Sequence, residues 1–157
     1  MKSIIEKFYT SFSHFDAEAM VSCYHKEVIF EDPAFGILKG EHAKNMWRML
    51  CNALDKTNDK ITFSDVEFEA EKGNAKWEAH YTFSQTKRRV HNKISASFEF
   101  KDDLIIKHTD EFNLHRWANQ ALGFKGFLFG GTNFFKNKLH AQTNKLLKKF
   151  EDNLNNG

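Results

Sequence analysis

Apolar side chains recur at helical spacing in three places within the first 55 residues. The first run covers residues 4–15, a shorter run from Ala17 to Tyr24 follows a candidate N-cap at Asp16, and the third covers residues 43–54. Residues three, four and seven positions apart share one face of a helix, so each run predicts an amphipathic helix. Between the second and third runs, EVIFED predicts a strand, and PAFGILKG predicts a stretch of turns.

Between Ile61 and Trp117 the pattern changes to strict alternation. Apolar and polar residues alternate through ITFSDVEFEAE, AKWEAHYTFSQ, HNKISASFEF and LIIKHTDEFNLH. Successive side chains of a strand point to opposite faces, so we expect four strands with one buried face. In the first of them, Val66 and Phe68 are expected on the buried face, and Lys72-Gly73-Asn74 predicts the turn that follows.

The C-terminal part follows neither the alternation nor the earlier helical runs. RWANQALG predicts a short helix that ends at Gly123, and GFKGFLFGGT predicts a loop rich in glycine and phenylalanine. The last helix has an apolar stripe, which contains Phe135, Leu139, Leu146, Phe150 and Leu154. We expect this part to pack over the mouth of the fold or against a second subunit, and its glycines could let it act as a lid.

Helices followed by a run of strands predict an α+β fold. We expect one domain, residues 1–157, with a curved antiparallel sheet wrapped around the N-terminal helices as a cone-shaped α+β barrel. Residues 117–157 would form a C-terminal helical extension. The chain has 17 phenylalanines, which predict a core or a pocket with aromatic walls.

Charge and cysteine content limit the kinds of partner and the cellular compartment that we expect. The net charge is +2, so we expect no nucleic acid, and no apolar run is long enough to span a membrane. The lysines of the last helix are interpreted as a solvated face, so no membrane partner is expected either. Cys23 and Cys51 are interpreted as reduced core residues of a cytoplasmic protein, although a disulfide between them stays open.

Two predicted strands place titratable groups on their apolar faces. Asp32 shares a face with Phe30, and Pro33 behind it holds Asp32 extended and ends the ladder. On the last strand His108 and Asp110 share the face of Phe112. Carboxyl groups in apolar surroundings have a raised pKa, which suits general acid–base catalysis. The alternative is structural: a buried His-Asp pair satisfies its own hydrogen bonds, and an aspartate before proline often forms a turn.

An aromatic wall is expected around these three catalytic candidates. The residues expected to bind a ligand are Phe30, Trp47, Trp77, Tyr81, Phe83, Phe98 and Phe112. We expect neither a metal nor an organic cofactor, because the histidines lack a metal-binding spacing and there is no glycine-rich phosphate loop.

The order of elements, with VIFEDPAFGILKG before a helix and a meander ending in LIIKHTDEFN, resembles the nuclear transport factor 2-like superfamily over residues 4–115. The sequence is most similar to its SnoaL-like, ketosteroid-isomerase-like branch. In ketosteroid isomerases the aspartate of Glu-Asp-Pro is the base, and Asp32 matches it. The two groups that polarise the carbonyl in those enzymes correspond to Phe8 and Ala96 here, so the resemblance does not imply steroid isomerisation. SnoaL-like cyclases place an acidic base near the last strand, where Asp110 stands.

Three functions stay open from the sequence. The first is a cofactor-independent isomerase, cyclase or dehydratase that acts on a small apolar molecule by proton transfer. The second is a binding protein for hydrophobic ligands, and the third is a homodimeric interaction module that pairs through the convex face of its sheet. Superfamily membership does not choose among them, because enzymes and non-enzymes share the fold.

Overall fold

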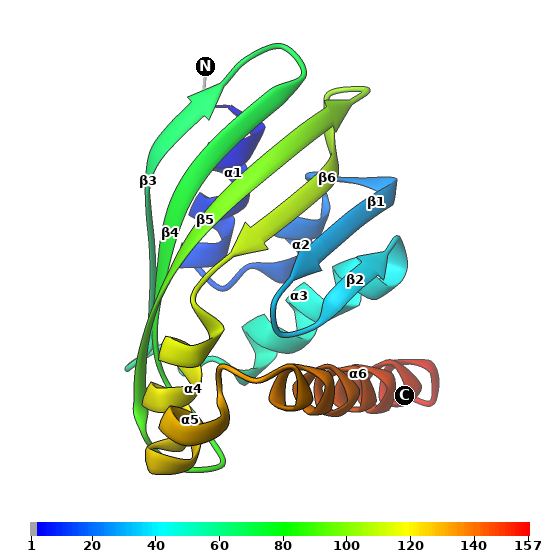
Figure 1. Cartoon of the computed structure of the whole chain (residues 1–157). Helices are drawn as coiled ribbons and strands as arrows, with labels where there is room; N and C mark the ends of the chain where they lie inside the picture. Colours follow the sequence, from blue (N-terminus) through cyan, green and yellow to red (C-terminus); the bar gives the residue numbers. More distant parts are fainter. Residues whose placement is uncertain (1–2) are drawn as a thin grey trace.

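The computed structural model describes residues 3–157, which form three N-terminal helices, a curved sheet and three C-terminal helices (Figure 1). The helices are α1 (Ile4–Ser13), α2 (Ala17–Val21), α3 (Glu41–Ala53), α4 (Leu114–Leu122), α5 (Phe124–Phe129) and α6 (Asn133–Asn155). The strands are β1 (Tyr24–Asp32), β2 (Gly36–Lys39), β3 (Lys60–Phe68), β4 (Lys72–Thr82), β5 (Arg89–Lys101) and β6 (Leu104–Glu111). The predicted α+β class is confirmed.

The six strands form one open sheet in the order β2-β1-β6-β5-β4-β3. All neighbours are antiparallel except β1 and β6, which run parallel. The sequence predicted a wholly antiparallel sheet, and this was wrong for the one pair whose strands are far apart along the chain and joined by no hairpin. The stretch PAFGILKG, predicted as turns, contributes the short strand β2.

The sheet curves around α1 (Figure 1), and irregularities in its edges assist the curvature. In β3 the register shifts between Ser64 and Glu67, where Asp65 has a positive φ of 51°. The shift breaks the predicted alternation, so Phe68 is half exposed instead of buried. Gly73 lies inside β4, not in the predicted turn. A Cβ there would meet the backbone oxygen of Glu67 at 2.9 Å and Ile5 Cδ1 at 2.5 Å, so glycine leaves room for both β3 and α1.

The core lies between the concave face of the sheet and helices α1 and α3. A capping box between Ser3 and Glu6 starts α1, whose residues Phe8 and Tyr9 are completely buried. Cys23 and Cys51 are both buried and unbonded, as expected of core residues.

The C-terminal segment is more helical than its sequence suggested. GFKGFLFGGT was predicted as a loop, but it forms α5 after Gly123 closes α4. A Cβ at Gly126 would collide with the backbone of Ala118, so only glycine at this position lets α5 pack closely on α4. In α6 the most buried residue is Leu147. Leu146, predicted to dock the helix, is half exposed but lines the cavity described below.

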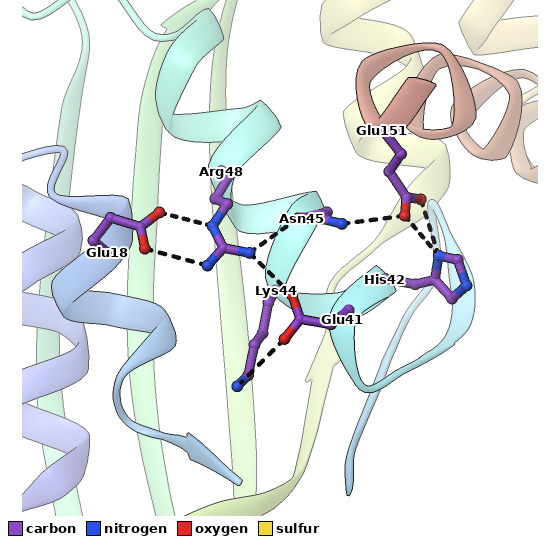
Figure 2. Close-up of polar contacts among 7 residues, drawn as sticks. All are labelled: Glu18, Glu41, His42, Lys44, Asn45, Arg48 and Glu151. Atoms are coloured by element: carbon purple, nitrogen blue, oxygen red, sulfur yellow. Dashed lines mark hydrogen bonds and ion pairs between the residues drawn. The ribbon is translucent and has the colours of Figure 1, made fainter. Parts of the chain in front are cut away.

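Polar contacts fix α6 against α3 (Figure 2). Glu151 of α6 accepts a hydrogen bond from Asn45 at 3.1 Å and pairs with His42 at 2.9 Å. On the other side of α3, Arg48 pairs with Glu18 of α2 at 2.7 Å and donates to Asn45 at 2.9 Å. One line of polar side chains therefore connects α2, α3 and α6 (Figure 2).

Candidate active site in an aromatic cavity

The parallel pairing of β1 with β6 brings the predicted carboxyl groups together. Phe30 is the register partner of His108 and Glu31 that of Thr109. Asp32 and Asp110 are the next residues on these strands; they line the same cavity, and the charge of Asp110 acts on Asp32. Side chains two positions apart share a face of a strand, so both carboxyl groups point to the concave side with Phe30 and His108. His108 is completely buried and Asp110 is 3% exposed. The predicted inward orientation of these residues is the one observed.

A chain of hydrogen bonds runs through the core to Asp110. Trp47 Nε1 donates to the Tyr24 hydroxyl at 2.8 Å, and that hydroxyl lies 2.7 Å from Nδ1 of His108. Burial raises the pKa of Tyr24 well above its ordinary value, so the phenol keeps its proton and donates it to Nδ1. Nε2 of His108 must then carry the other proton and donates to Asp110 Oδ1 at 2.8 Å. The chain fixes the tautomer of His108 and the orientation of Asp110.

Asp110 has one satisfied oxygen and one free oxygen. Oδ1 also accepts a hydrogen bond from Trp77 Nε1 at 3.3 Å. Oδ2 has no hydrogen-bond partner within residues 3–157, and Asp110 is part of the cavity lining. The structure therefore presents a buried carboxylate that can accept a hydrogen bond from a ligand.

Asp32 is held differently. Its Oδ1 accepts backbone hydrogen bonds from Ala34 at 3.0 Å and from Phe35 at 2.6 Å, so the side chain forms the turn expected of an aspartate before proline. Burial nevertheless raises the pKa of Asp32 from 3.8 to about 7, and the negative charge of Asp110 adds to this rise against the two backbone bonds. At neutral pH both the acid and the base form of Asp32 are therefore populated.

The two aspartates line a cavity of about 410 Å³. Its walls are mainly aromatic and include Phe12, Phe30, Trp47, Trp77, Phe112 and Trp117. Tyr81 and Phe83 also line it, as predicted. Two predicted lining residues, His108 and Phe98, lie behind the wall, because the ring of Phe98 packs against His108 with centroids 4.4 Å apart. His108 therefore orients Asp110 and does not face the cavity.

Helix α6 forms part of the cavity wall. His140 contacts the carbonyl of Pro33 at 2.8 Å, Thr143 donates to that of Ala34 at 2.9 Å and Asn144 to that of Phe35 at 3.0 Å. The helix is thus bonded to the turn that holds Asp32, and Leu139 and Thr143 reach the cavity.

Sequence reasoning missed Tyr24 as a site residue. Tyr24 was assigned to the preceding helix, but it begins β1, and the β1–β6 register shifts between Tyr24 and Ile29. Because of this shift, the alternation of β1 does not predict which way Tyr24 points, so no sequence pattern singled it out. Tyr9 is a second buried phenol, and its hydroxyl is the one buried side-chain polar atom without a partner among residues 3–157.

Within residues 3–157, no three histidine, cysteine, aspartate or glutamate side chains gather as a metal site would require. No helix of this part is long and apolar enough to span a bilayer.

An open curved sheet with helices on its concave face is a nuclear transport factor 2-like fold. The family model of the SnoaL-like domain matches residues 5–108, and the chain belongs to this family. No curated protein matches the sequence.

Solved structures are similar in fold at low sequence identity. A putative polyketide cyclase from Xanthomonas campestris pv. campestris is 18% identical with a TM-score of 0.60, covering 74% of this chain and 93% of the other. An LEH-like epoxide hydrolase from M. tuberculosis is 15% identical with a TM-score of 0.60, covering 81% and 88%. A hypothetical protein with a ketosteroid isomerase-like fold from Catenulispora acidiphila, in complex with trimethylamine, is 12% identical with a TM-score of 0.63, covering 75% of this chain and 91% of the other.

Proposed function

We propose that the protein is a cofactor-independent acid–base enzyme that transfers a proton on a small apolar molecule bearing a carbonyl or hydroxyl group. The observation that carries the proposal is the pair of neighbouring carboxyl groups, Asp32 and Asp110, in one aromatic cavity. The raised pKa of Asp32, about 7, gives it both forms near neutrality. The similar structures described as a putative polyketide cyclase and an epoxide hydrolase support an enzyme on this fold.

Asp32 is the proton-transfer group. In its ionised form Oδ2 takes a proton from the substrate, while the backbone N–H groups of Ala34 and Phe35 hold Oδ1 in place. The negative charge of Asp110 makes Asp32 a stronger base than an isolated carboxylate. In its protonated form Asp32 returns the proton, which completes an isomerisation, cyclisation or dehydration.

Asp110 binds and orients the substrate. Its free Oδ2 accepts a hydrogen bond from a hydroxyl of the ligand, and the chain from Trp47 through Tyr24 and His108 keeps Oδ1 fixed. The aromatic walls bind the apolar body of the ligand and keep water from the carboxyl groups.

The test is proton exchange in deuterated solvent. The protein should catalyse deuterium incorporation next to the carbonyl in members of a panel of apolar cyclic ketones that also carry a hydroxyl group for Asp110, followed by NMR. Asp32→Asn keeps the turn and should lower the rate about a hundredfold or more. Asp103→Asn, in an exposed turn, is the matched control and should leave the rate unchanged.

A second candidate is a binding protein for hydrophobic ligands, which the mainly apolar lining favours. If ketones quench the fluorescence of the cavity tryptophans but the protein catalyses no exchange, the protein binds these ligands and is not an enzyme that acts on them.

A further inference from the structure

The C-terminal segment is strongly basic, whereas the rest of the chain is not. Residues 112–150 contain no aspartate or glutamate, although the net charge of the whole chain is only +2. The basic residues of this segment are Arg116, Lys125, Lys136, Lys138, Lys145, Lys148 and Lys149, and all of them are exposed. The remainder of the chain is net negative, so one part of the molecule carries a concentrated positive charge.

The same segment exposes large apolar side chains. Phe124 is 73% exposed and Phe134 is 71% exposed, and three more side chains between them are at least half exposed. We define the phenylalanine patch as Phe124, Phe127, Leu128, Phe129 and Phe134. Five exposed large apolar side chains within eleven residues are unusual on the surface of a protein in water. They indicate contact with an apolar partner or with a membrane.

Three lysines of α6 share the outer face of that helix with Phe134, the patch residue on α6. Phe134, Lys138, Lys145 and Lys149 are spaced by four, seven and four residues, so they share one face. Lys138 Nζ lies 5.1 Å from the ring centre of Phe134, which joins the apolar and basic parts. His140, Thr143 and Leu147 lie on the opposite face, where they contact the body of the protein. Lys138, Lys145 and Lys149, which we call the lysine face, are therefore exposed to solvent on the side of α6 that points away from the body of the protein.

We propose that the phenylalanine patch and the lysine face of α6 form a docking surface for an anionic lipid membrane. Phenylalanine and leucine side chains enter the boundary between headgroups and acyl chains, while lysines bind the anionic headgroups. The protein lies on the bilayer and does not span it. This departs from the expectation drawn from the sequence, which treated the lysines as a solvated face and the phenylalanines as covered surface.

Charge decides against the other occupants. A second copy that pairs symmetrically through this surface sets two basic segments against each other. A nucleic acid neutralises the lysines but leaves most of the phenylalanine patch in water. An anionic bilayer satisfies both parts at once.

Co-sedimentation of the full chain with vesicles tests the proposal. We expect binding to vesicles of phosphatidylcholine with about 30% phosphatidylserine, weaker binding to phosphatidylcholine alone, and release as salt rises to about 0.5 M. Phe124→Ser/Phe129→Ser and Lys138→Glu/Lys145→Glu should each weaken binding about tenfold or more. The matched controls are Ile37→Ser, an exposed apolar residue of β2, and Lys26→Glu/Lys39→Glu on β1 and β2. Circular dichroism confirms that each variant is folded.

Three results would overturn the proposal. The first is the absence of binding to the anionic vesicles, or binding that the control variants weaken as much as the patch variants. The second is that the protein does not bind vesicles but binds a single-stranded oligonucleotide, and that the lysine variants weaken this binding. The third is a dimer in light scattering that the phenylalanine variants dissociate, again without vesicle binding.

Discussion

Tyr24 and His108 are 84 residues apart in the sequence, yet their hydroxyl and Nδ1 atoms lie 2.7 Å apart in the centre of the core. This contact connects Trp47 on α3 to Asp110 in the cavity, because the same hydroxyl accepts from the indole and the same imidazole donates to the carboxylate. The orientation of a candidate catalytic group therefore depends on a phenol that does not line the cavity.

Replacing Tyr24 with phenylalanine should destabilise the protein by about 1–3 kcal/mol, because it leaves Trp47 Nε1 without an acceptor and His108 without its donor in the core. Urea unfolding measures the loss. Trp47→Phe and the double variant complete a mutant cycle, and the double variant should cost less than the two single changes together. Strict additivity would contradict the hydrogen-bond chain.

Asp32→Asn should change how stability depends on pH. The pKa of Asp32 is raised from 3.8 to about 7, so between these values the folded protein keeps a proton that the unfolded chain has released. The free energy of unfolding contributed by this group is therefore complete below pH 3.8, falls as pH rises to about 7 and stays low above it.

The asparagine variant lacks this loss, so it should be more stable than the wild type at pH 8 by on the order of a few kcal/mol, and close to it near pH 4. Chemical unfolding at several pH values measures the difference. Equal offsets at pH 4 and pH 8 would show that Asp32 has an ordinary pKa.

Asp110→Asn should lower the pKa of Asp32, because the negative charge of Asp110 contributes to its rise. Asparagine keeps an oxygen that can accept from His108 and Trp77, so the change removes mainly the charge. Carboxyl titration of Asp32 by NMR measures the shift, with Asp103→Asn as the control. An unchanged Asp32 would mean that the two carboxyl groups are not coupled.

Gly126→Ala should destabilise the C-terminal helices, because the added Cβ collides with the backbone of Ala118. The expected cost is about 1–3 kcal/mol. Gly131→Ala is the matched control, since its Cβ would meet the ring of His115 at an ordinary 3.4 Å. Thermal unfolding compares the two variants, and similar melting temperatures would contradict the close packing of α5 on α4.

The sequence by itself determined the local elements and the direction of most side chains. Alternation placed His108 and Asp110 on the buried face of β6, and helical spacing placed Trp47 on the buried face of α3, because these periods follow from backbone geometry alone. The sequence also predicted the turn at Asp32, because the following Pro33 keeps Asp32 extended. In the structure Asp32 Oδ1 accepts a hydrogen bond from the Ala34 N–H in this turn.

Only the tertiary structure decided which of these residues meet. The parallel pairing of β1 with β6 brings Asp32 and Asp110 to one cavity, and no local pattern encodes a pairing between strands so distant in the chain. The register shift near Asp65 exposed Phe68 against its alternation, and the glycine-rich stretch that resembled a loop forms α5, which packs closely on α4 at Gly126. In these places contacts between elements outweighed local preference, since burial of apolar surface contributes more free energy than propensity does.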